Sequence, residues 1–349
     1  MSVRPELLRA DNLTPSSRTP WGGRAIIERF KPDLGPCVQG PVGESWEVSV
    51  EPSFPSRLQR GGGEVPLSDV IARDPVAWLG RTLAERHGQT TLLIKLLDAG
   101  DDLSLQVHPA WDDPALADGE SGKCESWVIL DAQPGCGIYL GFRDGVGRDD
   151  VRACIEEHGP LDDLMNFVTV RRGDVFSIRD GTPHAVGRGV TLFEPQAVLP
   201  GRRGVTYRYW DWNRRYDERG NPDPAGHMRE LHLRRSLEAT RWDAPRGAAF
   251  VDWCREPGSV LHDDGALRIE HVLRCPWYEV TRVTGTGRWT LPTDDRMVAV
   301  TCVEGEADAR TGLGDISLAI GTSGVIPAAA RDVELTLRAA DLFVVQECC

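Results

Sequence analysis

The stretch that decides the fold is Gly173-Asp174-Val175-Phe176-Ser177-Ile178-Arg179-Asp180-Gly181-Thr182-Pro183-His184. The run Val175–Ile178 predicts a short strand, and Gly181 predicts a tight turn after it. The turn would return His184 to the interior of a β-structure. A lone histidine in such a place is more often a core residue bonded to a backbone carbonyl. Its companions in the sequence therefore decide whether it has a chemical role.

Those companions come from two earlier segments, Leu103-Ser104-Leu105-Gln106-Val107-His108-Pro109 and Gly122-Lys123-Cys124-Glu125. On a strand, residues i and i+2 face the same way, so Gln106 and His108 can point at one atom. With Glu125 and His184 they offer two imidazoles, a carboxylate and an amide oxygen. Such a set suits Zn²⁺ with one position left for water or substrate. We therefore expect a catalytic site with one zinc ion per chain.

The composition indicates a soluble, loop-rich β protein, with 37 glycines and 24 prolines among 349 residues. A net charge of −13 argues against bulk nucleic-acid binding, but a local basic pocket for a sugar phosphate stays possible. The sequence has no signal-peptide pattern and no long apolar run, so we expect no membrane association. Nine cysteines without a CxxC pair favour reduced thiols and a cytoplasmic location.

Short strands separated by turns dominate the first two thirds of the chain, which points to a β-sandwich or barrel. Two helical segments interrupt them, one at about 68–85, with Pro75 inside it, and one at 151–158. The expected strands are 46–50, 91–97, 104–108, 126–130, 137–142, 166–171, 175–178, 185–186 and 190–194.

Residues from about 240 onward repeat this β character without the chemistry. The segment Ile178–His184 can be laid on Ile326–Asp332, where Asp332 takes the place of His184. The pattern at 173–184 is the second half of a cupin motif. We therefore predict an all-β protein of two cupin-type jelly-roll β-barrels. Residues 1–235 would form the catalytic, metal-binding domain, with the helical insertion at about 68–85, and 240–349 a metal-free second barrel.

Five segments, in order and spacing, resemble type I mannose-6-phosphate isomerases (phosphomannose isomerases) of the cupin superfamily. They are Leu92–Asp98, Leu103–Pro109, Gly122–Glu125, Gly181–Ala185 and Thr206–Trp212, and Trp21-Gly22-Gly23 and Gly43–Ser49 fit the same family. The resemblance covers residues 20 to about 235. It implies a zinc-dependent aldose–ketose isomerase that interconverts mannose 6-phosphate and fructose 6-phosphate.

The resemblance also implies roles for individual residues. The family's zinc ligands fall on Gln106, His108, Glu125 and His184, and its proton-handling or charge-stabilising residues on Lys123, Glu194 and Arg208. Ser104 matches a serine near the phosphate end of the substrate. We add Lys95 and Trp21 as substrate-binding candidates, although Lys95 could instead pair with Glu44, Glu47 or Asp98.

The chemistry agrees with those roles. Moving a carbonyl from C1 to C2 requires a base that takes the C2 proton and returns it to C1. The enediolate intermediate carries negative charge, which a metal and a fixed cation can stabilise. Glu194 is a candidate base, unless it is a surface glutamate. Arg208 offers a permanent charge, unless it forms a structural ion pair with Asp211.

Three departures from the family pattern leave the substrate open. Ala110-Trp111 follows Pro109 where an acidic residue is usual, and Cys124 stands where threonine is common. The 195–205 connection is longer and carries Arg202 and Arg203. An isomerase of another sugar phosphate and a non-catalytic sugar-phosphate sensor therefore remain alternatives, and an iron-dependent oxygenase ranks last. We expect a monomer or a homodimer.

Overall fold

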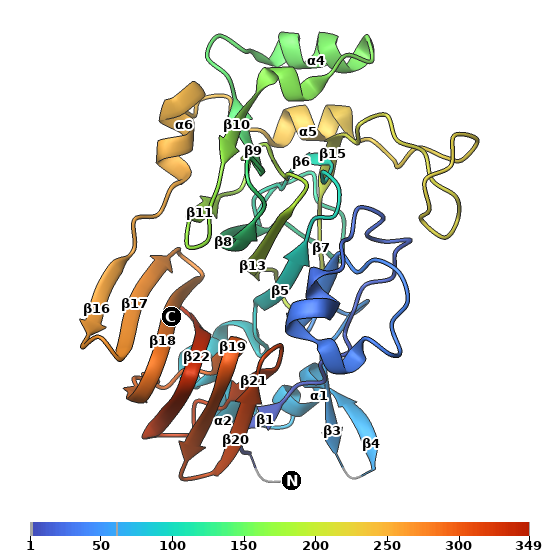
Figure 1. The fold of residues 1–349 in the computed structure, drawn as a ribbon. Coiled ribbons are helices and arrows are strands. Elements are labelled where there is room, and N and C mark those ends of the chain that lie inside the picture. Colours follow the sequence, from blue (N-terminus) through green and yellow to red (C-terminus); the bar gives the residue numbers. More distant parts are fainter. Residues whose placement is uncertain (1–2, 61, 349) are drawn as a thin grey trace.

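Three large β-sheets organise the computed structural model, which describes residues 3–60 and 62–348 (Figure 1). The inner sheet has the order β11 (Val175–Ile178), β8 (Cys124–Ala132), β13 (Val190–Ala197), β5 (Leu92–Asp98), β2 (Glu44–Val48). The outer sheet has the order β10 (Met165–Thr169), β9 (Gly137–Phe142), β12 (His184–Val186), β6 (Leu105–Val107), β15 (Tyr207–Trp210).

The C-terminal sheet contains eight strands and includes one from the start of the chain. Its order is β1 (Glu6–Leu7), β21 (Ser323–Ile326), β19 (Val298–Thr311), β22 (Val333–Glu347), β18 (Tyr278–Leu291), β17 (Leu267–Arg274), β16 (Ser259–Asp263), with β20 (Gly314–Ala319) beside β19. Two small ribbons pair β3 (Arg57–Arg60) with β4 (Gly63–Pro66), and β7 (Glu120–Ser121) with β14 (Arg203–Gly204).

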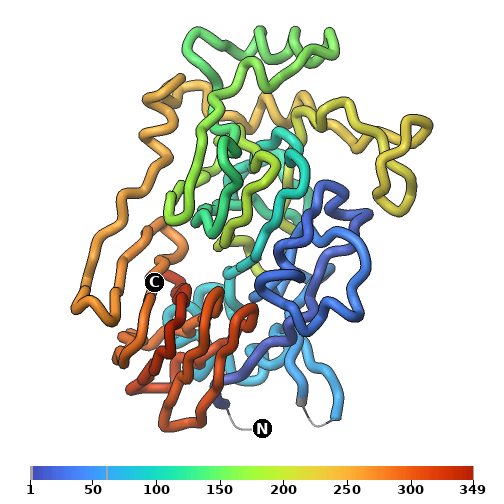
Figure 2. The backbone as a smooth tube through the Cα atoms, viewed as in Figure 1, coloured from blue at the N-terminus to red at the C-terminus, as the bar shows by residue number. Residues whose placement is uncertain are grey.

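Short helices connect and cover the sheets. They are α1 (Leu67–Ala72), α2 (Pro75–Leu79), α3 (Arg81–His87), α4 (Arg148–Glu156), α5 (Leu233–Ala239) and α6 (Gly247–Cys254), together with single turns at Ile26–Phe30, Pro32–Leu34 and Leu161–Leu164. Figure 2 shows α4 and α5 at the far end from the C-terminal sheet, and a long loop, 211–232, that projects beside them.

The helical segment expected at 68–85 is present but divided into three helices. Pro75 starts α2, and Asp74 caps it by accepting a hydrogen bond from the Ala77 amide at 3.1 Å. Gly80 then turns the chain with a φ of +80°, where a Cβ atom would meet the Asp295 carbonyl oxygen at 1.8 Å. These two residues break what would otherwise be one helix.

Helix α6 lies in the region where the sequence predicted only strands. Phe250 and Cys254, one helical turn apart, are buried in the core between the inner and outer sheets. This i, i+4 pair is the apolar stripe of a short helix, which a search for strand alternation overlooks.

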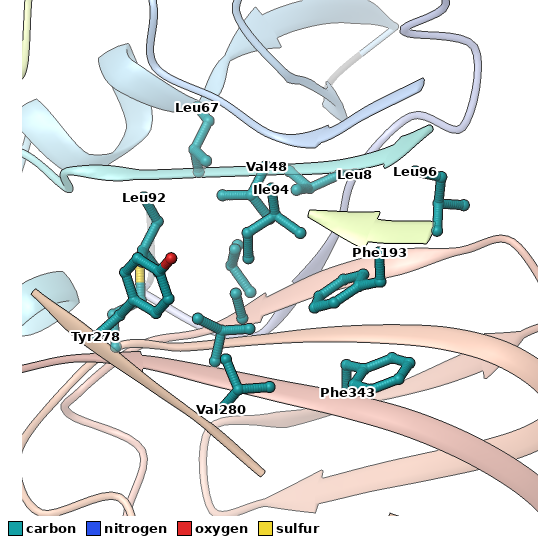
Figure 3. Packing of buried hydrophobic residues seen from close by; sticks show 14 of the residues in the cluster. Leu8, Val48, Leu67, Leu92, Ile94, Leu96, Phe193, Tyr278, Val280 and Phe343 are labelled. Carbon is teal, nitrogen blue, oxygen red and sulfur yellow. The ribbon is translucent and has the colours of Figure 1, made fainter. Parts of the chain in front are cut away.

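The inner sheet is buried on both faces. Ile94, Leu96 and Phe193 point toward the C-terminal sheet, where the rings of Phe193 and Phe343 stack with centroids 4.5 Å apart (Figure 3). Leu97 and Leu192 point the other way, into a core shared with the outer sheet. Successive residues of each strand thus serve two different cores.

The expected internal repeat has a structural counterpart. Ile178 ends β11 and His184 begins β12, while Ile326 ends β21 and Val333 begins β22. Both segments are therefore a strand, a turn and a second strand. The strand pairings leave the large sheets open at their edges. The predominantly β prediction is confirmed, and the arrangement as two jelly rolls stays a prediction.

None of the described helices has the length and apolar character needed to cross a membrane. The cysteines of the described part of the chain are free thiols, and Cys349 lies outside it.

Replacing Phe343 by alanine should lower the free energy of unfolding by about 3–5 kcal/mol, because it removes a fully buried ring and leaves a cavity between two sheets. Urea denaturation followed by tryptophan fluorescence measures this. Phe167→Ala is the control, since that ring is 47% exposed, and its effect should be small. Equal losses in the two variants would contradict the packing described here.

Candidate metal centre and its pocket

Strand register brings the predicted site residues together between the inner and outer sheets. In the outer sheet Gln106 pairs with both His184 and Arg208. In the inner sheet Lys95 pairs with Glu194, and Glu125 pairs with Gln196. Paired residues on neighbouring strands point to the same face. The two sheets therefore present these polar side chains to one another.

Gly181 is the turn residue that the sequence predicted. Its φ is +73°, and its amide donates to the His108 carbonyl oxygen at 2.8 Å. A Cβ atom there would lie 2.8 Å from the Ala239 carbonyl oxygen. Glycine is thus required for both conformation and space, and the turn ties the His108 segment to the strand that carries His184.

His108, Glu125 and His184 form a buried triad whose ligand atoms all lie within 4.8 Å of one another. The Nε2 atom of His108 is 3.2 Å from Oε2 of Glu125, and Nε2 of His184 is 3.2 Å from Oε1. Each imidazole therefore directs one nitrogen at the same carboxylate.

The other imidazole nitrogens fix the tautomers. Nδ1 of His108 donates to the Val205 carbonyl oxygen at 3.0 Å, and Nδ1 of His184 donates to that of Thr182 at 2.8 Å. Since a neutral imidazole has one N–H, both Nε2 atoms then carry lone pairs. Burial and the nearby Lys123 charge lower the pKa of His108 to about 3, which keeps its ring neutral.

The carboxylate of Glu125 is ionised beside the two imidazoles. Burial works to raise its pKa, but the charge of Lys123 opposes this, and the pKa is held well below its usual value. Nζ of Lys123 is 3.2 Å from Oε2, and the Gln196 amide donates to Oε2 at 2.8 Å.

The triad fits a bound cation. Lone pairs on two imidazoles facing a carboxylate are all acceptors, and they do not satisfy one another. Among the described residues, Nε2 of His108 and Oε1 of Glu125 are buried with no hydrogen-bond partner. A metal ion satisfies such atoms, and the carbonyls on Nδ1 are the partners that orient metal-binding histidines.

Gln106 stands next to the triad. Its Nε2 is 3.3 Å from Nε2 of His184, and its Oε1 is 3.4 Å from Oγ of Ser104. Because amide oxygen and nitrogen exchange places by a half-turn, the side chain can present its oxygen at the same position.

A pocket of about 200 Å³ opens beside the triad. It is lined by seven of the ten predicted site residues: Trp21, Lys95, Ser104, Gln106, Lys123, Glu194 and Arg208. The remaining three are the triad itself. Lys123 and Gln106, which contact triad members, connect the pocket to the candidate metal centre.

Glu194 lies on the pocket wall and is not a surface residue. Its Oε1 accepts from the Trp127 indole at 3.0 Å, and its Oε2 is 3.6 Å from Nζ of Lys95. Burial and the charge of Glu125 raise the pKa of Glu194 to about 7. A carboxyl group with such a pKa can both take and return a proton near neutral pH.

Lys95 joins two acids of the pocket. Nζ is 3.5 Å from Oε1 of Glu44, in addition to its contact with Glu194. Of the other partners considered from the sequence, Glu47 pairs with Lys31 at 2.8 Å, and Asp98 accepts from Thr191 at 3.1 Å.

Arg208 reaches into the pocket from β15. Its Nε donates to Oγ of Ser104 at 3.1 Å, and its Nη1 donates to the Glu230 carbonyl oxygen at 2.9 Å. The ion pair considered with Asp211 is replaced by ion pairs of Asp211 with Arg214 and Arg229. Burial and the charge of Arg229 lower the pKa of Arg208 to about 10, so it stays cationic at neutral pH.

Two supporting residues were missed from the sequence. Gln196 holds Glu125, and Trp127 holds Glu194 and also contacts the His184 ring, with centroids 5.3 Å apart. Each lies two positions after a predicted site residue on the same strand, Gln196 after Glu194 and Trp127 after Glu125. The strand period of two was therefore a signal for both.

Known proteins resemble this chain in sequence and in fold. The family described as "Phosphomannose isomerase type I, catalytic domain" matches residues 14–123. A mannose-6-phosphate isomerase of Streptococcus mutans is 28% identical over 311 residues, which cover 88% of each chain.

Solved structures agree in fold over nearly the whole length. The mannose 6-phosphate isomerase of Bacillus subtilis superposes with a TM-score of 0.79 at 22% identity, covering 98% of this chain and 99% of that one. A zinc-bound mannose 6-phosphate isomerase superposes with a TM-score of 0.71 at 18% identity, covering 99% and 100%. With the matched catalytic segment and the relative that spans most of both chains, these likenesses show that the chain is similar in sequence to type I phosphomannose isomerases and shares the fold of solved mannose 6-phosphate isomerases.

Proposed function

We propose that this chain is a zinc-dependent isomerase that interconverts mannose 6-phosphate and fructose 6-phosphate. The observation that carries the proposal is the buried triad of ligand atoms beside a pocket that contains a carboxyl group with a pKa of about 7. The names of the relatives supply the substrate, and the pocket supplies the chemistry.

Zinc would be held by His108, Glu125 and His184, with Gln106 adding an amide oxygen. Two imidazoles with a carboxylate suit zinc, and a vacant position is typical of catalytic sites. Bound there, the ion would supply a positive charge that polarises a substrate oxygen.

Glu194 is our candidate for the base that takes the proton from C2 and returns it to C1. The Trp127 indole and Lys95 hold its carboxylate on the pocket wall. The reaction would pass through an enediolate, whose negative charge needs fixed cations nearby.

Lys123 and Arg208 provide those cations. Lys123 contacts the Glu125 ligand and lines the pocket, and Arg208 is held in place by Ser104. Ser104, Lys95 and Trp21 also line the pocket, and we assign them to substrate binding.

We further propose the division into units that the sequence predicted. Residues 1–235, with the helical insertion at about 68–85, would be the catalytic cupin domain, and 240–349 a second cupin-like unit. Strand β1 belongs to the first unit by sequence but pairs with β21 in the sheet of the second. The cytoplasm as location, and a monomer or homodimer as the assembly, belong to the same proposal.

An isomerase of another sugar phosphate is the second candidate. The longer 195–205 connection favours it, because Arg203 lines the pocket and pairs with Glu120 across the short β7–β14 ribbon. This segment therefore shapes the pocket in a way that the family motifs do not specify.

Metal binding is tested by His184→Ala, with His227→Ala as the control from a surface loop. The first variant should lose zinc affinity by at least about 10-fold, and zinc should raise its Tm less than that of the original protein. Zinc content after dialysis and Tm with and without zinc measure both. Unchanged zinc affinity in His184→Ala would show that the triad is not the zinc site.

The activity is tested by a coupled assay on mannose 6-phosphate, with protein as purified, after chelation and after the return of zinc. We expect activity that disappears with chelation, returns with zinc and is absent in His108→Ala. A folded, zinc-loaded protein without activity would overturn the proposed substrate. A panel of other sugar phosphates would then separate the second candidate from a sensor that binds without turnover.

The pH dependence tests Glu194. As pH falls through about 7, Glu194 takes up a proton, so kcat/KM should fall on the acidic side. Glu194→Gln should lower kcat by about 10²- to 10⁴-fold. Trp127→Phe removes a hydrogen bond to the Glu194 carboxylate, which should raise the pKa of Glu194. The acidic limb of the kcat/KM profile should therefore shift to higher pH. A limb that does not move in Trp127→Phe would argue for another base.

A further inference from the structure

The pocket is richer in cations than in acids, although the chain as a whole carries a net charge of −13. Its cationic lining residues are Arg18, Lys95, Lys123, Arg203, Arg208 and Arg229, and its acidic ones are Glu44, Glu51 and Glu194. A local excess of positive charge in a concave site attracts anions.

Five of these six cations already have polar partners. Lys95, Lys123, Arg203 and Arg229 each lie within 4.0 Å of a carboxylate oxygen, and Arg208 donates to Ser104 and to the Glu230 carbonyl. Their charges are therefore offset, or their donors occupied, by groups of the protein itself, although Nη1 of Arg229 makes no hydrogen bond within the described residues.

Arg18 differs from the other five. Within the described part of the chain, its guanidinium has neither a hydrogen-bond acceptor nor a carboxylate within 4.0 Å. It lies instead 4.7 Å from the ring centroid of Trp46 and 5.5 Å from that of Phe54. Stacking on aromatic rings positions a guanidinium while it leaves the N–H donors free.

We infer that Arg18 binds the phosphate group of the substrate at the mouth of the pocket and selects phosphorylated over unphosphorylated sugars. The inference rests on the proposed function, because it assigns a recognition residue to that same pocket. A guanidinium with unused donors matches a phosphate dianion in charge and in bidentate geometry.

A series of contacts leads from Arg18 to the candidate base Glu194. The Trp46 indole on which it stacks is also 4.6 Å from Nζ of Lys95, and Lys95 contacts Glu194. Arg18 is solvent-exposed, whereas Lys95 and Glu194 are buried. A substrate with its phosphate at Arg18 would therefore direct its sugar inward, toward Glu194 and the triad.

Stacking on Trp46 and Phe54 favours a planar group at the end of the side chain at position 18. Lysine keeps the charge but loses the planar fork and the stacked geometry, and methionine keeps much of the length without charge. The two substitutions therefore separate charge from positioning. Neither changes a residue that contacts the triad.

The experiment compares Arg18→Met and Arg18→Lys with Arg29→Met. Arg29 is a matched control, because its guanidinium lies 5.6 Å from the Phe30 ring but outside the pocket, where it pairs with Asp131. In the zinc-loaded protein we measure kcat and KM for mannose 6-phosphate, the inhibition constant of inorganic phosphate, and phosphate binding by calorimetry.

We expect Arg18→Met to raise KM and the inhibition constant of phosphate by about 10- to 100-fold, with kcat nearly unchanged. Arg18→Lys should fall between Arg18→Met and the original protein, and Arg29→Met should match the original. Unchanged KM and phosphate inhibition in Arg18→Met would overturn the inference and leave Arg208 to hold the phosphate. A fall in kcat alone would overturn it as well.

Failure of the proposed function gives a different result. If the original protein does not isomerise mannose 6-phosphate, calorimetry with inorganic phosphate still tests Arg18. Weaker phosphate binding in Arg18→Met but not in Arg29→Met would then support the inference for an anion-binding pocket. Equal binding in all three proteins would overturn it.

Discussion

Two buried imidazole lone pairs face one buried carboxylate, and much of the structure serves to hold them there. All three groups are acceptors when His108 and His184 are neutral and Glu125 is ionised, so the arrangement is unfavourable without a cation. The fold maintains it through backbone carbonyls on the two Nδ1 atoms and through Lys123 and Gln196 on the carboxylate. A metal site that is formed before the metal arrives costs stability, which the surrounding packing must offset.

That packing comes mainly from the inner sheet. On one face of the same strands it carries Ile94, Leu96 and Phe193, and on the other Lys95 and Glu194. The C-terminal sheet covers the apolar face, so that β5 and β13 are fixed in register behind the polar one. The register of β5 and β13 then sets the distance between Lys95 and Glu194 more tightly than loops would. The C-terminal sheet contributes no member of the triad, yet it supports the strands that do.

The sequence was sufficient to predict that His108, Glu125 and His184 lie together, because their signals are local. Gln106 lies on β6 and His108 directly after the end of that strand, and the turn at Gly181 is followed at a fixed interval by His184. Contacts between residues on different strands were harder to predict from the sequence. The pairing of Lys95 with Glu194 depends on β5 lying beside β13, and the contact of Arg208 with Ser104 depends on β15 lying beside β6. Sequence spacing does not determine strand order, so these contacts required the structure.

The placement of β1 has a consequence for the order in which the protein folds during synthesis. Glu6 pairs with Val325, so this segment leaves the ribosome long before its partner strand has been made. The inner and outer sheets, by contrast, draw their strands from residues between Glu44 and Trp210 and can pair earlier. Contacts between segments so distant in sequence form late and slow the final step. Closure of the C-terminal sheet by β1 is therefore expected late in folding, and until then the edge of β21 that β1 covers stays exposed.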